Sequence, residues 1–202
     1  GLVLGGLGAW GKIHGGPITR DLLAMYTTVV RAVPELILIL ILYFGVTDLV
    51  NQILVAFGHE RIQISGVLAG IAVLGVVQGA YATEVLRGAI QSVPVGQIEA
   101  ARAMGIPPGL LARRVTLPLM LANALPGLAN LWLIATKDTA LLAVVGFAEL
   151  TQQTRQAAGA TKAYFTFFMA AGLLYLLLSI LSTWGFARLE RRARRGLPEV
   201  RG

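Results

Sequence analysis

The 202-residue chain has no cysteine, only two histidines and few charged residues, and each of these shortages excludes a class of function. Without cysteine, neither a disulfide framework nor a thiolate metal site can form. His14 and His59 lie too far apart for a local metal motif, so we expect no metal site. Charged residues make up 13% of the chain, compared with about 25% in soluble domains. This composition excludes an ordinary soluble domain.

The sequence also lacks the residue arrangements that enzymes use. It contains no Gly-x-x-x-x-Gly-Lys-Ser/Thr run that could cradle the phosphates of a nucleotide. It shows no pair of catalytic carboxylates, no histidines at metal-ligand spacing and no serine–histidine arrangement. We therefore expect no catalytic residue and no cofactor in this chain.

Apolar surface, in contrast, is abundant. Hydrophobic residues make up 56% of the chain, and the mean hydropathy is +0.73. The net charge of +7 would allow nucleic-acid binding, but the arginines are placed wrongly for that role. Five of them crowd the end of an apolar run: Arg188, Arg191, Arg192, Arg194 and Arg195. This placement is typical of a cytoplasmic membrane anchor, so we expect contact with a lipid bilayer and no nucleic-acid partner.

Four apolar segments are long enough to cross a bilayer, which takes about 20 residues. They cover 34–57, 64–92, 117–145 and 164–187. The apolar segment 1–10 is too short to span, and we interpret it as the tail of a first helix whose beginning is missing. The prediction is an all-α transmembrane protein with five spans in the intact chain, in which 1–202 forms a single domain.

The connection 93–116 is too polar to span and contains good helix formers. The run GQIEAARAM predicts a helix, Gly105 can end it, and Pro107 and Pro108 begin another short turn. We expect a helix–turn–helix elbow beside the membrane. If this elbow is cytoplasmic, then the 12–31 loop and the basic tail 188–202 are cytoplasmic too. Only Arg61, Arg155 and Lys162 then lie outside, and the asymmetry supports this orientation.

The segment 93–118 resembles the cytoplasmic loop of ATP-binding-cassette importer permeases. That loop reads Glu-Ala-Ala, three residues, Gly, nine residues, an aliphatic residue, one residue and Leu-Pro. The matching residues are Glu99, Ala100, Ala101, Gly105, Val115, Leu117 and Pro118. Every spacing matches, and the one departure is valine at 115, where isoleucine is usual.

The resemblance extends along nearly the whole chain to the polar amino acid subfamily. It is carried by YTTVVRAVPELILILILYFG, GAYATEVLRGAIQSVPVGQIEAARAMG and LPGLANLWLIATKDTALLAVVG. RAVPEL, AYATEVLRGA and LERR are similar to the Q-type permease of histidine, lysine, arginine and ornithine importers and of opine importers. The resemblance implies a type I importer permease fold in a bacterial inner membrane. It also implies an importer of polar, cationic amino acids or opines.

Partners follow from the same resemblance. It implies a second permease that is a paralogue, two ATPase subunits that hold Mg²⁺ and ATP, and a periplasmic solute-binding protein. Contact with the ATPase would fall to Glu99, Ala100, Ala101, Arg102, Gly105 and Pro118. The small alanines would let the helix enter a groove, Gly105 would permit the sharp turn, and Pro118 would fix the angle of the next span. The alternative is an amphipathic helix that lies in the headgroup layer.

Ionisable residues within apolar spans are candidates for the transport pathway. Glu84 and Arg87 stand three apart on one helical face and can form a structural pair, or Glu84 can contact the cargo. The group Lys137, Asp138 and Thr139 interrupts the fourth span and predicts a break in the helix. There, Lys137 could bind a cargo carboxylate and Asp138 a cargo cation, or a salt bridge could hold the bend.

Three further polar residues lie in the spans. Gln78 and Asn130 are amides that could hydrogen-bond the cargo or a neighbouring helix, and Tyr81 could line the pathway or pack as an aromatic. An ion-coupled secondary transporter of small polar solutes is the rival function. Such a protein would need no docking loop, and it usually shows a doubled repeat that is absent here.

Overall fold

The computed structural model describes residues 1–61 and 66–195, and within these it contains helices and no strand. The first expected residues of the 64–92 span and the end of the basic tail lie outside the described residues. The helical elements, in chain order, are α1 (Leu2–His14), α2 (Pro17–Ala32), α3 (Glu35–Ala56), α4 (Gly66–Gln91), α5 (Val95–Ala103), α6 (Pro108–Leu111), a π-helix η1 (Ala112–Thr116), α7 (Leu117–Asp138), a 3₁₀-helix η2 (Thr139–Val145), α8 (Leu150–Thr161) and α9 (Tyr164–Ala193).

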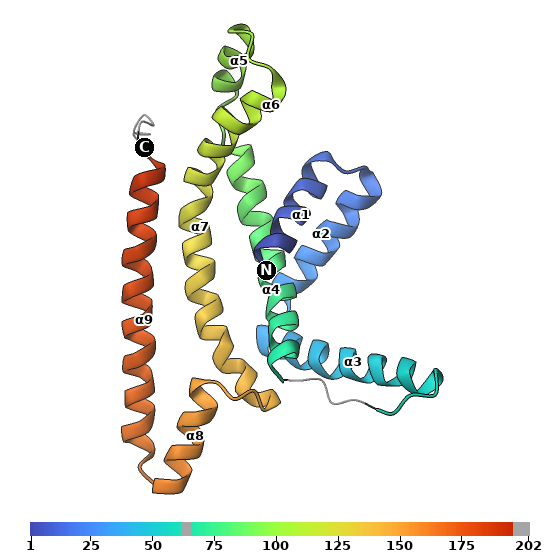
Figure 1. The fold of residues 1–202 in the computed structure, drawn as a ribbon, viewed down its shortest axis with the longest axis vertical. Helices are drawn as coiled ribbons and strands as arrows, with labels where there is room; N and C mark the ends of the chain where they lie inside the picture. The colour runs from blue at the N-terminus through green and yellow to red at the C-terminus, as the bar shows by residue number, and fades with distance from the viewer. Residues whose placement is uncertain (62–65, 196–202) are drawn as a thin grey trace.

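The four predicted spans are confirmed as helices within the described part of the chain. Four stretches there are long and apolar enough to cross a membrane: Glu35–Ala56, Ala69–Gln91, Pro108–Val145 and Tyr164–Ala193. The third stretch runs from α6 through η1 and α7 to η2, so the elbow leads into the span without a loop. Figure 1 shows α4, α7 and α9 running along the long axis of the molecule.

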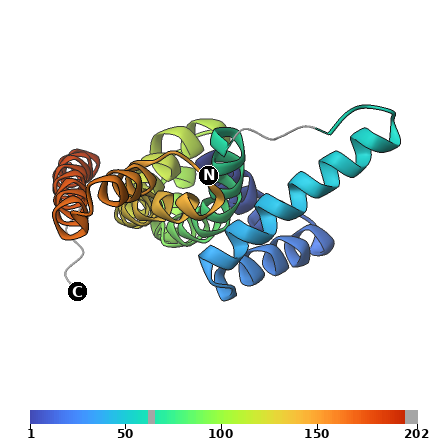
Figure 2. The same cartoon turned by 90° about the horizontal axis from the view of Figure 1, so that it is seen from below.

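The two ends of the molecule carry different elements. The elbow of α5 and α6 projects at one end, and the last residues of α9 lie toward the same end (Figure 1). Helix α8 and the beginning of α9 lie at the opposite end. Seen from below, α9 forms one edge of the molecule and α2 and α3 form the other (Figure 2).

Helices α1 and α4 pack closely through small residues, as the glycine-rich and alanine-rich third span predicts. Gly5 and Gly8 are buried, and they face Ala82 and Thr83, which are also buried. A Cβ atom at Gly5 would collide with Ala82, and one at Gly8 would collide with Thr83. Glycine at these two positions therefore allows the helix backbones to approach.

The expectation that 12–31 forms a loop is wrong. Residues up to His14 continue α1, and α2 begins with Pro17 in its first turn, where the missing N–H of proline has no helical partner to lose. The Tyr26 hydroxyl donates to the Val76 carbonyl oxygen at 2.5 Å, and Val30 packs in a buried cluster with Val77 and Ala80. Because these α4 residues lie in the middle of a span, the second half of α2 lies at the same depth.

Helix α3 runs crosswise to α4, α7 and α9 (Figure 1). Only its first turns are packed: Leu38 clusters with Val30 and Val77, and Ile39 clusters with Val73 and Leu142. The remainder exposes large apolar side chains, including Ile41, Phe44, Val46, Leu49, Ile53 and Val55. Its surface is therefore apolar and mostly uncovered by this chain.

Helix α8 did not emerge from the sequence analysis. It begins at Leu150, and the Glu149 carboxylate caps it by accepting from the backbone N–H groups of Thr151 and Gln152 at 2.8 and 2.7 Å. The Tyr175 hydroxyl of α9 also donates to Glu149, at 3.2 Å. Farther along α9, the Trp132 indole of α7 donates to the Ser182 hydroxyl at 3.0 Å. These contacts hold α9 against α8 and α7.

Candidate functional site

Two interruptions of helices come together beside the middle of α4. The first is the extended Val33, which with Pro34 separates α2 from α3. The second is the change from α7 to the 3₁₀-helix η2 after Asp138, where the helix changes type at the polar group without a gap between the two elements. Irregular helix of this kind is found where transporters bind cargo.

Four side chains from three spans meet at these interruptions, and we call them the junction cluster: Glu35, Gln78, Tyr81 and Asp138. The Gln78 amide donates to Oδ2 of Asp138 at 3.0 Å. The Glu35 carboxylate interacts electrostatically with both Asp138 and Tyr81. The guanidinium of Arg31 lies over the Tyr81 ring, 5.9 Å from its centroid. The predicted pathway residues Gln78, Tyr81 and Asp138 are thus brought together.

The junction cluster carries an excess of negative charge. Asp138 is buried, with 7% of its surface exposed, and Glu35 is half-buried. Across the described residues, neither carboxylate forms an ion pair with a lysine or arginine. A buried charge is costly unless it is paired and hydrogen-bonded, and the Gln78 amide supplies only one neutral donor. The arrangement is therefore suited to accept a cation.

Lys137, Thr139 and Asn130 do not join the cluster. Lys137 is exposed although Asp138 is buried, because adjacent residues project in different directions on a helix, and no ion pair links the two within the described chain. Of the alternatives for this polar group, a mutual salt bridge between Lys137 and Asp138 is therefore absent from the described part of the chain. The Thr139 hydroxyl donates to the Thr136 carbonyl oxygen at 2.7 Å, a contact back to the last turn of α7. Asn130 is exposed and makes no hydrogen bond with the cluster residues, all of which are described.

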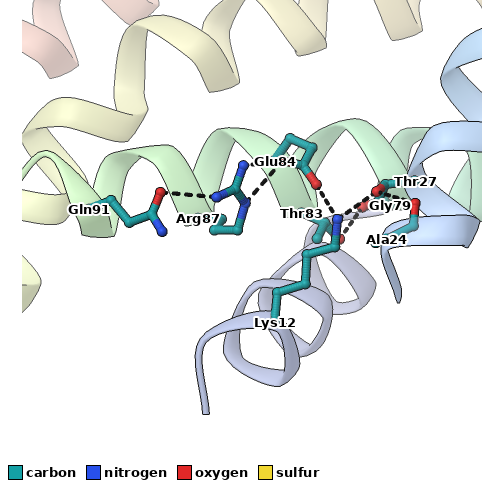
Figure 3. Close-up of polar contacts among 8 residues, drawn as sticks. All are labelled: Lys12, Ala24, Thr27, Gly79, Thr83, Glu84, Arg87 and Gln91. Carbon is teal, nitrogen blue, oxygen red and sulfur yellow. Dashed lines mark hydrogen bonds and ion pairs between the residues drawn. The ribbon is translucent and has the colours of Figure 1, made fainter. Parts of the chain in front are cut away.

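Glu84 belongs to a second group of polar side chains, which we call the ion cluster: Lys12, Thr27, Glu84 and Arg87. The predicted pair is present, since Nη2 and Nε of Arg87 donate to Oε2 of Glu84 at 2.7 and 3.0 Å. The other oxygen, Oε1, accepts from Nζ of Lys12 in α1 at 2.5 Å. Figure 3 shows the Lys12 ammonium group between Glu84 and Thr27. Both carboxylate oxygens are occupied, which favours the structural interpretation of Glu84.

The elbow has the predicted helix–turn–helix form. Helix α5 ends at Ala103, Gly105 adopts the left-handed conformation with φ +71°, and α6 begins at Pro108. The Gly105 N–H donates to the Arg102 carbonyl oxygen at 2.9 Å, and the Ile106 N–H donates to the Ala101 carbonyl oxygen at 3.2 Å. A residue with a side chain rarely adopts this φ, so the turn depends on glycine.

The motif residues of the elbow divide into two sets. Glu99, Ala100, Arg102 and Gly105 are exposed, whereas Ala101 is only 3% exposed. Ala101 is therefore buried within the elbow and offers little of its surface to a partner, unlike the neighbouring Ala100. Met104 is 74% exposed at the end of α5, and it adds an apolar side chain to the accessible face.

Pro118 stands at the second position of α7, directly after the π-helix η1. A proline inside a helix lacks the N–H donor, and its ring crowds the carbonyl group four residues earlier. The π-helix widens the turn where that carbonyl lies, because its hydrogen bonds reach back five residues, as from the Leu117 N–H to the Ala112 carbonyl oxygen. Pro118 is therefore accommodated by a local change of helix type.

Glu35 of the junction cluster, Lys12 and Thr27 of the ion cluster, and the neighbouring Arg31 were not predicted as site residues. Lys12 and Arg31 fall at the two ends of the segment 12–31, which the sequence predicts as a cytoplasmic loop. A residue pattern cannot show that α2 folds back along α4, which brings Arg31 and Glu35 to Tyr81. The one available signal was that Glu35 is an acid at the edge of a long apolar run.

Comparison with known proteins places these features among transport proteins. Residues 1–195 match the profile of the family described as "Binding-protein-dependent transport system inner membrane component". The chain is 43% identical to the nopaline transport system permease protein NocQ of Agrobacterium fabrum, over 98% of this chain and 84% of that protein. It is 37% identical to the histidine/lysine/arginine/ornithine transport system permease protein HisQ of Escherichia coli, over 95% of this chain and 84% of that protein.

Solved structures agree in fold. A chain in the crystal structure of an amino acid ABC transporter with histidines superposes with a TM-score of 0.78 at 29% identity, over 95% of this chain and 84% of that chain. A chain of the methionine transporter MetNI in an inward-facing conformation superposes with a TM-score of 0.69, over 95% of this chain and 85% of that chain. At 22% identity, the second likeness shows a shared fold alone.

Proposed function

Since the chain belongs to the family of binding-protein-dependent transport system inner membrane components and is a permease subunit of an amino acid or opine ABC importer, we propose that its cargo is cationic and passes the junction cluster. The relatives that carry a cargo in their names include transporters of histidine, lysine, arginine and ornithine, of arginine, of nopaline and of octopine. These names support a cationic amino acid or an opine as the cargo class.

The observation that carries the proposal is the pair of carboxylates without an ion-pair partner in the described chain. Asp138 and Glu35 interact electrostatically with each other, and like charges at short range are unfavourable. A cargo guanidinium or ammonium group would relieve this repulsion and replace lost hydration with charge-assisted hydrogen bonds. Gln78 keeps Asp138 oriented through its amide, and Tyr81 offers a ring face and a hydroxyl.

A cargo amino acid also carries a carboxylate, and Arg31 is positioned to receive it. Its guanidinium is exposed and lies over Tyr81, in the same junction as the two carboxylates. Arginine binds carboxylates in a fork of two parallel hydrogen bonds. In this assignment Arg31 replaces Lys137, which is exposed and forms no ion pair with Asp138 in the described chain.

The importer requires further subunits. We propose a second permease of similar fold, a paralogue, together with two ATPase subunits and a periplasmic solute-binding protein. In this proposal the ATPase subunits bind ATP and Mg²⁺, because this sequence has no phosphate-cradling loop. The exposed apolar surfaces of α3 and α9 are suited to contact with lipid and with the second permease.

The elbow is the proposed contact with an ATPase subunit. Its exposed face combines Glu99, Ala100, Arg102, Met104 and Gly105. A short, stiff helix that carries small residues and one large apolar side chain can enter a groove and transmit force. ATP binding would draw the two elbows of the transporter together and open the cargo path outward, and hydrolysis would reset it. The projection of α5 beyond the ends of α4 and α7 favours docking over a position in the headgroup layer (Figure 1).

We further propose a bacterial inner membrane location with a cytoplasmic C-terminus. The elbow and the final turns of α9, with Arg188, Arg191 and Arg192, lie toward the same end of the molecule (Figure 1). The bias of basic residues toward this end supports its assignment to the cytoplasm.

Reconstitution tests this function. The permease pair and the ATPase subunits are placed in liposomes with the binding protein, and uptake of radiolabelled arginine, ornithine, histidine and glutamine is measured with ATP or with an ion gradient. We expect ATP to drive uptake of the cationic cargoes far better than that of glutamine. Uptake driven by an ion gradient without ATP would instead support a secondary transporter. Preference for glutamine would contradict the cationic assignment.

A further inference from the structure

The ion cluster joins three helices that are separate in the sequence. Lys12 is in α1, Thr27 is in α2, and Glu84 and Arg87 are in α4. The Lys12 ammonium group donates to Glu84 at 2.5 Å and to the Thr27 hydroxyl at 2.6 Å, and that hydroxyl donates to the Ala24 carbonyl oxygen at 3.2 Å. Only 11% of the Lys12 side chain and 17% of the Glu84 side chain are exposed.

This burial makes the contacts mutually dependent. A charge in a poorly hydrated site is tolerated when it is paired and is strongly unfavourable when its partner leaves. Separation of α1 from α4 would leave Lys12 and Glu84 without each other as partners, which is unfavourable in a poorly hydrated site. The close glycine contacts of Gly5 and Gly8 with α4 lie just before Lys12 in the same helix, so polar and steric contacts hold the same pair of helices.

The helices that the ion cluster joins lead both to the junction cluster and to the elbow. Along α4, Gln78 of the junction cluster lies about 9 Å from Glu84, at ~1.5 Å per residue. In the other direction, α4 ends at Gln91, and the elbow begins at Val95 after the buried Val93. Helix α2 ends beside Tyr81, where Arg31 lies, and leads to Glu35.

We propose that Lys12 is a positioning residue for transport, because it locks α1, α2 and α4 into one rigid unit that transmits movement of the elbow to the junction cluster. This inference rests on the proposed function. When the elbow moves, α4 carries Gln78 and Tyr81, and through Lys12 it also carries α2 with Arg31 and Glu35. Without Lys12, α2 keeps its Tyr26 and Val30 contacts with α4 but loses its polar link to Glu84, so it follows α4 less closely, and hydrolysis proceeds without a full rearrangement of the cargo site.

The test compares Lys12→Met with Lys12→Arg in the complete reconstituted complex. The readouts are basal ATPase activity, cargo-stimulated ATPase activity and the number of cargo molecules imported per ATP hydrolysed. We expect Lys12→Met to lower the import per ATP roughly fivefold or more, a typical size for coupling between sites, while basal hydrolysis persists. Lys12→Arg keeps the charge and should retain most of the coupling. Lys162→Met, an exposed lysine between α8 and α9, is the matched control.

Two further variants keep the test decisive if Lys12→Met assembles poorly. Thr27→Val removes one acceptor of Lys12 without removing a charge, and it should lower the import per ATP in a stable complex. Lys12→Glu combined with Glu84→Lys should recover part of the coupling that either single change abolishes. An unchanged import per ATP in both Lys12→Met and Thr27→Val would overturn the inference. A fall in cargo import that is fully explained by a smaller amount of assembled complex would also overturn it. If the unaltered complex imports nothing with ATP, the proposed function itself fails.

Discussion

The side-chain amide of Gln78 donates a hydrogen bond to the carboxylate of Asp138 at 3.0 Å, and this contact links the middle of α4 to the last residue of α7. It orients a buried carboxylate at the point where α7 changes to a 3₁₀-helix. Glu35 adds a second carboxylate from α3 to the same place. The junction cluster is thus assembled from three spans, and no single span supplies all four of its side chains.

Replacement of Asp138 by asparagine should impair transport of cationic cargo with little loss of stability. The asparagine oxygen still accepts from Gln78, so packing of α4 against α7 is retained, but the negative charge is lost. A hydrogen bond to a charged group contributes about 1.5–3 kcal/mol, so we expect cargo-stimulated ATPase activity to require roughly 10-fold to 100-fold more cargo. Titration with arginine in liposomes measures this change.

The control for that experiment is Asp48→Asn, the same chemical change at an exposed position of α3. It should leave the cargo titration unaltered. A lowered melting temperature in Asp138→Asn, together with a normal cargo titration, would instead assign Asp138 to structure.

Replacement of Glu84 by glutamine should destabilise the protein. Lys12 and Arg87 would each lose a carboxylate partner, and Lys12 is largely buried. Removal of one partner of a buried pair costs about 3–5 kcal/mol, and the partial exposure of this site favours the lower end of that range. The measurement is the thermal unfolding of the purified complex in detergent.

Glu190→Gln provides a matched comparison, because it removes the exposed pair with Arg194 in the last turns of α9. An exposed pair contributes about 1 kcal/mol or less. Equal melting temperatures for the two variants would contradict the structural role of Glu84.

Replacement of Gly105 by leucine should abolish transport while the protein still inserts into the membrane. A side chain at φ +71° costs about 1–2 kcal/mol, which is enough to redirect the elbow without unfolding the spans. Uptake in cells and the amount of permease in isolated membranes are measured together. Gly109→Leu is the control, because Gly109 lies in the same elbow but has an ordinary φ and open space around it. We expect this variant to transport more cargo than Gly105→Leu. Normal uptake in Gly105→Leu would rule out the elbow as the ATPase contact.

A reporter fused after Gly202 should locate the C-terminus. Alkaline phosphatase, which is active only outside the cytoplasm, should be inactive there, and a fluorescent protein that folds in the cytoplasm should be bright. The reason is the row of arginines at the end of α9, which favours the cytoplasmic side. Strong phosphatase activity would reverse the proposed orientation.

The sequence by itself determined the class of this protein. Long apolar runs predict membrane helices because a bilayer leaves no other partner for backbone polar groups, and the four predicted runs are helices. The elbow is equally local: the spacing from Glu99 to Pro118 can be recognised in the sequence, and Gly105 supplies the turn that only glycine adopts readily. The change of helix type after Asp138 falls where three polar residues interrupt an apolar run of the sequence.

Only the tertiary structure decided which polar residues belong together. Helix α2 has no long apolar run, yet it packs on α4 through Tyr26 and Val30. That packing brings Lys12 to Glu84 and Arg31 to Tyr81, although 72 and 50 residues separate the partners. Within the elbow, the packing of α5 likewise leaves Ala101 buried while its neighbour Ala100 is exposed. Pairing of buried charges depends on the positions of whole helices, and those positions are set by side-chain packing between segments that are distant in the sequence.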